Sequence, residues 1–137
     1  MQINGKKNMK FTVMSDIRAA LLSDPAIMSH VAGRIYPVVA PENSPTGPFI
    51  VYTRDGYGME RTKQGIYVQK CSVYISCVSA DYDDANLLAS EVFGRLDGFA
   101  NYENPDTGVR ISRITMTDST EDFAADRYIV TLKFDIE

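Results

Sequence analysis

The feature that most constrains the fold of this chain is a strongly patterned run from Tyr67 to Leu96. Its first part, 67–78, alternates apolar and polar residues and places Cys71, Val73, Ile75 and Cys77 on one side. A period of two predicts a β-strand with one apolar face. Cys71 and Cys77 would lie about 20 Å apart on such a strand, and a disulfide needs Cα atoms within about 7 Å. We therefore expect two buried, unpaired cysteines.

The second part of the run predicts an amphipathic helix that begins after Asp81 and ends before Gly98. Asp81 can cap the helix, and Asp84 lies near the positive end of the helix dipole. The apolar residues form one stripe at helical spacing: Ala85, Leu88, Ala89, Val92, Phe93 and Leu96. We expect this stripe to pack on the apolar face of the preceding strand.

Weaker patterns predict the remaining elements. Apolar positions between Phe11 and Leu22 have helical spacing, and Ser15 or Asp16 could instead begin this helix as a cap. Ser23 or Asp24 then opens a short helix with Pro25 at its first position, which continues to Gly33. Strands are expected at 49–54, 109–117 and 127–136, the second with a bulge near Ser112 or Arg113. The segments 55–65, 99–108 and 118–126 are rich in polar or turn residues and are expected to be loops.

This order of elements predicts an α+β fold with a four-stranded, mainly antiparallel sheet, in α-β-β-α-β-β order, and helices packed on one face. The 137 residues are expected to form a single domain, with residues 1–10 as a disordered N-terminal end. Hydrophobic residues make up 45% of the chain, so a core can form without a metal or a disulfide.

Charge and hydropathy exclude several classes of partner. A net charge of −4 and a pI near 5.0 argue against nucleic-acid binding as the main activity. The sequence contains no run of about 20 apolar residues, so we expect no membrane-spanning helix. The segment from Met1 to Lys10 lacks the apolar core of a signal peptide, which predicts synthesis and folding in a cytoplasm.

The sequence offers little for catalysis. His30 is the sole histidine and has no neighbouring cysteine, so neither a zinc site nor a Ser-His-Asp triad is indicated. The spacing of Asp81, Asp83 and Asp84 does not match a calcium loop. We therefore expect no enzyme activity, no metal and no cofactor. A small enzyme that uses the carboxylates of segment 118–126 is kept as a weak alternative.

Several segments together resemble the small tail completion, or head–tail joining, proteins of long-tailed bacteriophages and prophages. They are Gly33-Arg-Ile-Tyr-Pro37, Pro48-Phe-Ile-Val-Tyr52, the strand 69–78 with its helix, and Leu132-Lys-Phe-Asp-Ile136. The resemblance extends from about Met14 to Glu137. It implies a virion structural protein that caps the tail tube at the head–tail joint as a ring, often a hexamer. Implied partners are copies of itself, the tail-tube protein and head connector proteins. Implied locations are the host cytoplasm during assembly and then the virion.

If the resemblance holds, the two long polar segments are the expected contact surfaces. The candidate interaction residues are Tyr57, Met59, Glu60, Arg61 and Lys63 in the first segment and Glu121, Asp122 and Phe123 in the second. Tyrosine is enriched at protein interfaces, and the chain has eight tyrosines. The main alternative is a stand-alone regulatory or ligand-binding module of ferredoxin-like type.

Overall fold

The computed structural model describes residues 10–41, 47–61 and 67–137, and at residues 10, 56–61 and 67–69 it describes the backbone alone. The helical elements in these ranges are η1 (Lys10–Thr12), α2 (Val13–Leu22), α3 (Pro25–Val31) and α4 (Tyr82–Leu96). The strands are β1 (Ile35–Pro37), β2 (Phe49–Arg61), β3 (Tyr67–Ser79), β4 (Ala100–Glu103), β5 (Arg110–Ala124) and β6 (Arg127–Ile136).

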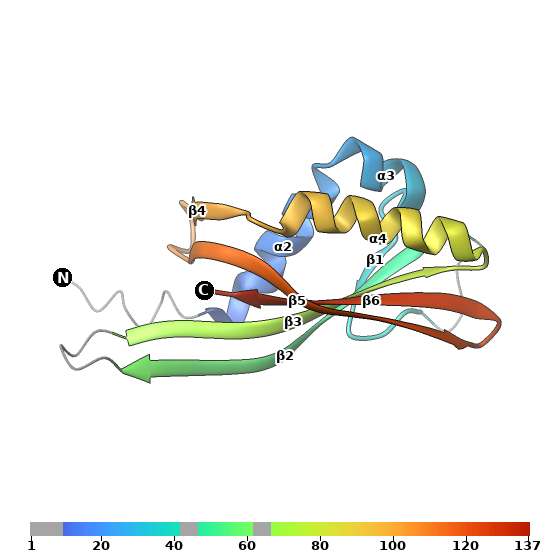
Figure 1. Ribbon diagram of the computed structural model, residues 1–137. Helices are drawn as coiled ribbons and strands as arrows, with labels where there is room; N and C mark the ends of the chain where they lie inside the picture. Colours follow the sequence, from blue (N-terminus) through green and yellow to red (C-terminus); the bar gives the residue numbers. More distant parts are fainter. Residues whose placement is uncertain (1–9, 42–46, 62–66) are drawn as a thin grey trace.

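The strands form one curled, mixed sheet with the order β1-β2-β3-β6-β5-β4 (Figure 1). The predicted four-stranded sheet is therefore wrong, although the α+β class and the two long hairpins are right. The sheet has six strands and is mixed, because β1 pairs with β2 in parallel. β1 and β4 have three and four residues, too few to show a period of two in the sequence. The order also differs from the β-α-β-β-α-β sequence of a ferredoxin-like module.

Both long hairpins extend further than the sequence pattern indicates. β2 continues to Arg61 through most of the predicted loop 55–65, and β5 continues to Ala124 through most of the predicted loop 118–126. The predicted loop 99–108 likewise contains β4. From Thr117 to Ala124 every β5 side chain is exposed, so no apolar alternation arises there. These extensions exist because backbone hydrogen bonds to the partner strand are satisfied whatever the side chains are.

Bulges bend the two outer long strands. The N–H groups of Ser112 and Arg113 both donate to the Glu137 carbonyl, at 2.6 and 3.4 Å, which confirms the bulge expected there. The pairing register also shifts between Arg54 and Gly56 in β2 and between Met116 and Asp118 in β5. Bulges increase local twist, which explains the curl of the sheet.

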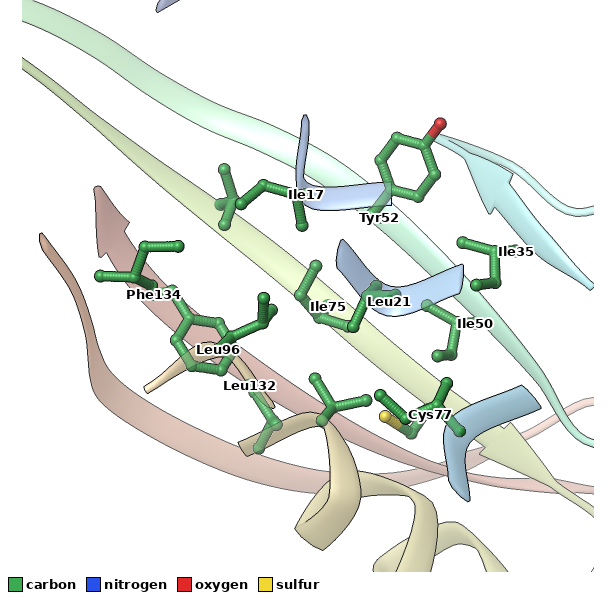
Figure 2. Packing of buried hydrophobic residues seen from close by; sticks show 14 of the residues in the cluster. Ile17, Leu21, Ile35, Ile50, Tyr52, Ile75, Cys77, Leu96, Leu132 and Phe134 are labelled. Carbon is green, nitrogen blue, oxygen red and sulfur yellow. The ribbon is translucent and has the colours of Figure 1, made fainter. Parts of the chain in front are cut away.

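The central strand and helix are placed as predicted. The Asp81 carboxylate accepts the Asp84 N–H at 3.0 Å and caps α4. The apolar face of β3 is buried and packs with α4, and both cysteines are free and buried. Phe93 is the exception, because its side chain is 41% exposed and lies outside the buried stripe. Figure 2 shows inward side chains from β2, β3 and β6 meeting those of the helices in one core.

Of the two N-terminal helices, α3 is capped by Asp24 as predicted, whereas α2 does not begin at the caps considered for it. The predicted capping role of Asp16 or Ser15 is wrong, because α2 begins at Val13 and has no side-chain cap. Asp16 is instead 8% exposed and accepts hydrogen bonds from Tyr102 Oη at 2.9 Å and Asn104 Nδ2 at 2.7 Å. This contact fastens the β4–β5 hairpin to α2. No helix in the described ranges is long and apolar enough to cross a membrane.

Candidate functional site: the free sheet edges

The structure divides the predicted interaction residues between two hairpins. Glu121, Asp122 and Phe123 lie on β5, close to the turn that joins it to β6. Tyr57, Met59, Glu60 and Arg61 lie on β2, where the structure describes the backbone alone, and Lys63 lies outside the described residues. The two hairpins project from opposite ends of the sheet (Figure 1). The two groups therefore cannot form one surface on a single copy.

The β5–β6 hairpin ends in a two-residue turn. Ala125 and Asp126 have φ values of 51° and 59°, and Ala124 pairs with Arg127 across the strands. Two consecutive residues with positive φ are the backbone signature of a type I′ turn, whose twist matches that of paired strands. The turn therefore keeps the hairpin extended to its end.

An aromatic cluster joins this hairpin to the start of α4. The ring of Tyr128 contacts Phe123 at a centroid distance of 4.9 Å and Tyr82 at 5.5 Å. The Tyr82 hydroxyl donates to Glu121 Oε2 at 2.6 Å, and this bond and the Glu121 charge raise the pKa of Tyr82. Phe123 and Tyr82 remain 54% and 46% exposed. Exposed aromatic rings held in place by neighbours are typical anchors of protein interfaces.

Each end of the sheet leaves a length of strand edge without a described partner strand. β1 pairs with β2 at Ile50, Val51 and Tyr52, and no described strand pairs with that edge beyond them. β4 pairs with β5 between Arg110 and Arg113, and the rest of that β5 edge has no partner strand among the described residues. Such edges carry N–H and C=O groups that can accept another strand.

Sequence reasoning missed one exposed apolar site. Val38 and Val39 follow β1 and are 69% and 72% exposed. Val38 has φ of 62°, a conformation that is costly for a β-branched residue, and its N–H donates to the Tyr52 carbonyl at 2.8 Å. The two adjacent valines between Pro37 and Pro41 were a usable signal in the sequence, because a turn does not require apolar β-branched residues.

The outer face of the sheet carries a shallow hollow with largely apolar walls. Its lining comes from β2, β3 and the end of the β5–β6 hairpin: Phe49, Val51, Ser76, Val78, Ala124, Ala125, Arg127 and Ile129. The Arg127 guanidinium lies over the Phe49 ring at 5.6 Å. Among the described residues, no group of three or more His, Cys, Asp or Glu side chains is placed to hold a metal ion.

Comparisons with known proteins found a matching family and a similar solved structure. The model of the family described as tail completion protein gp17 matches residues 15–136. A chain from the virion of a native gene transfer agent particle superposes with a TM-score of 0.73 at 16% sequence identity, over 88% of this chain and 89% of that one. No curated protein matches the chain. Since the family model spans almost the whole sequence, the chain belongs to the tail completion protein gp17 family and is a virion structural protein with a role in tail completion.

Proposed function

We propose that this protein acts as a non-catalytic ring at the joint between head and tail, where it caps the tail tube. Family membership supports the tail-completion role. The observation that supports a ring is that the sheet has, on opposite sides, two lengths of strand edge with no partner strand among the described residues. A contact between two different patches repeats from copy to copy, and it closes into a ring when the rotation allows.

The proposed partners are neighbouring copies of the chain, the tail-tube protein and head connector proteins. The similar chain comes from an assembled particle, which supports the proposed place of this protein in the virion. Before that, the protein would be assembled in the host cytoplasm. The candidate residues on β2 and β5 serve the contact between copies in this proposal. The tail-tube and connector contacts would use the two rims of the ring.

Deletion of the gene from the producing phage or prophage tests this function. We expect separate heads and tails in electron micrographs, and complementation with the wild-type gene should restore joined particles. Gold-labelled antibody should mark the joint, and native mass spectrometry of protein released from particles should give a multiple of the 15.3 kDa chain. Normally joined, active particles from the deletion strain would refute the proposal.

A further inference from the structure

The backbone hydrogen bonding along the outer edge of β5, the side away from β6, changes at Ile114. Up to that residue β5 is bonded on the side away from β6, because the Ile114 N–H donates to the Phe99 carbonyl and the Gly98 N–H to the Ile114 carbonyl, both at 2.8 Å. From Met116 to Phe123 no described strand lies on that side. Eight residues of β5 therefore lack a partner strand on that side among the described residues, a length of edge that natural proteins usually protect.

The pairing register shows which N–H groups face outward. Hydrogen bonding alternates along an antiparallel ladder, and a two-residue turn is flanked by a hydrogen-bonded pair, here Ala124 and Arg127. Counting back from that pair, the N–H groups of Ser119, Glu121 and Phe123 point away from β6. On the other side of the bulge, the Met116 N–H also points outward, because it donates to Asp97.

Aspartate side chains occupy three of these outward donors. Met116 N–H donates to Asp97 Oδ1 at 2.8 Å. Ser119 N–H donates to Asp118 Oδ1 at 2.9 Å, and Phe123 N–H donates to Asp122 Oδ1 at 2.7 Å. A strand that would pair here must offer carbonyl groups in place of these carboxylates. The carboxylates therefore satisfy the outward N–H groups and also block another strand from pairing with them, as charged residues do on protected edges.

The edge of β2 beyond Tyr52 runs in the direction that antiparallel pairing with β5 requires. In the order β2-β3-β6-β5 each neighbour is antiparallel, so β2 and β5 run in opposite directions. If a second copy lies with its β2 next to β5 of the first copy, the two strands are antiparallel and the alternation of the sheet continues across the contact. Two β5 edges would repel each other, because segment 118–126 has four acidic residues and no basic one, whereas segment 53–61 has two of each.

We propose that the outer edge of β5, from Met116 to Phe123, takes up β2 of a second copy as an added antiparallel strand, and that Asp97, Asp118 and Asp122 close this edge in the separate chain. The inference rests on the proposed ring and names the contact that builds it. Carbonyl groups of the incoming β2 replace the aspartate oxygens, and the freed carboxylates turn to solvent. Main-chain bonding of this kind supplies affinity in strand-addition complexes.

Cysteine pairs test the strand addition directly. Ser119→Cys would be combined in turn with Tyr57→Cys and Met59→Cys, and each single variant is a control. Within one copy, β5 and β2 are separated by two strands, about 14 Å, so a bridge can form only between copies. We expect a ladder of covalent oligomers from oxidised particles on non-reducing gels for at least one pair. No ladder from either pair, in particles that contain the protein, would overturn the pairing.

A matched pair of proline variants tests whether the N–H groups that point away from β6 are the ones needed for the contact between copies. Ser119→Pro removes an outward N–H, which an edge strand tolerates, whereas Thr120→Pro removes an N–H bonded to β6. We expect Ser119→Pro to melt within a few degrees of wild type and to leave heads and tails unjoined, and Thr120→Pro to melt clearly lower. Wild-type joining by Ser119→Pro, or similar melting of both variants, would contradict the proposal.

The closing role of the aspartates is tested on the isolated chain. Asp118→Ala with Asp122→Ala removes both acceptors, and the corresponding pair of asparagine substitutions keeps an acceptor oxygen without the charge. Sedimentation should show self-association at about tenfold lower concentration for the alanine pair, a difference of about 1.4 kcal/mol, and less change for the asparagine pair. Equal association of wild type and the alanine pair would refute the closing role. Absence of the wild-type protein from the head–tail joint would refute the proposed function instead.

Discussion

The buried carboxylate of Asp16 gives the sharpest prediction for stability. It accepts hydrogen bonds from Tyr102 Oη at 2.9 Å and Asn104 Nδ2 at 2.7 Å, and both donors are half-buried. A hydrogen bond to a charged group contributes about 1.5–3 kcal/mol, and partial exposure favours the lower end of that range. We expect Asp16→Ala to lower the free energy of unfolding by about 2–4 kcal/mol. For a chain of this size that corresponds to a fall in melting temperature of roughly 6–15 °C.

A double-mutant cycle with Tyr102→Phe isolates the contact. Tyr102→Phe alone should lower the free energy of unfolding by about 1–2 kcal/mol, and much less once Asp16 is alanine. Asp16→Asn is the matched control, because it keeps an acceptor oxygen and the side-chain volume. Urea unfolding followed by circular dichroism gives each value. If the two losses add within about 0.3 kcal/mol, the hydrogen bond contributes nothing and the reasoning fails.

The same contact predicts a pH dependence. The hydrogen bond to Asp16, with burial and the Asp16 charge, raises the pKa of Tyr102 above its ordinary value of 10.0. A group whose pKa is higher in the folded state stabilises the fold fully below its unfolded pKa, and that contribution disappears as the pH rises through the folded pKa. Alkaline titration of tyrosinate absorbance should show one tyrosine shifting to lower pH in Asp16→Ala. An unchanged titration curve would count against the contact.

Three further predictions concern other parts of the fold. Asp24→Ala should lower the free energy of unfolding by about 1 kcal/mol in urea denaturation, because its carboxylate accepts two N–H groups in the first turn of α3. Val38→Gly should raise the free energy of unfolding by about 1 kcal/mol in the same assay, because it relieves a positive φ and loses little burial. Burial raises the pKa of the Cys77 thiol, so a thiol reagent should modify Cys71 and Cys77 only after denaturant is added; rapid modification of the native chain would contradict that burial.

The sequence predicted elements well wherever one face of an element is buried. The alternation of β3 and the stripe of α4 arise because the core selects apolar residues at the period of each element. The same reasoning located β6 with its bounds intact and the Asp24 and Asp81 caps, which depend on hydrogen bonds within a few residues. Phe93 fits the helical stripe in the sequence, but its side chain is 41% exposed in the structure.

The candidate site was harder to predict for a physical reason. At the ends of the β2–β3 and β5–β6 hairpins, polar residues in strands cannot be told from polar residues in loops, because no core imposes alternation. Glu121, Asp122 and Phe123 are predicted interaction residues of a loop; the structure places them, exposed, in a strand, and their part in an interaction stays a prediction. The role of Asp118 and Asp122 as acceptors for outward N–H groups depends on the pairing register, which no local pattern encodes.

The sequence by itself thus determined the central strand and helix, the α+β class, the acidic charge and the resemblance to tail completion proteins. The strand, the helix, the fold class and the charge follow from periodicity, capping and composition, which act over one turn or one strand. The resemblance rests instead on particular segments such as Gly33-Arg-Ile-Tyr-Pro37. Only the tertiary structure decided that the sheet has six strands, which edges remain open and where Asp16 places its carboxylate. Those features depend on which strands pair across the chain, and pairing is fixed by the global arrangement of the core rather than by neighbouring residues.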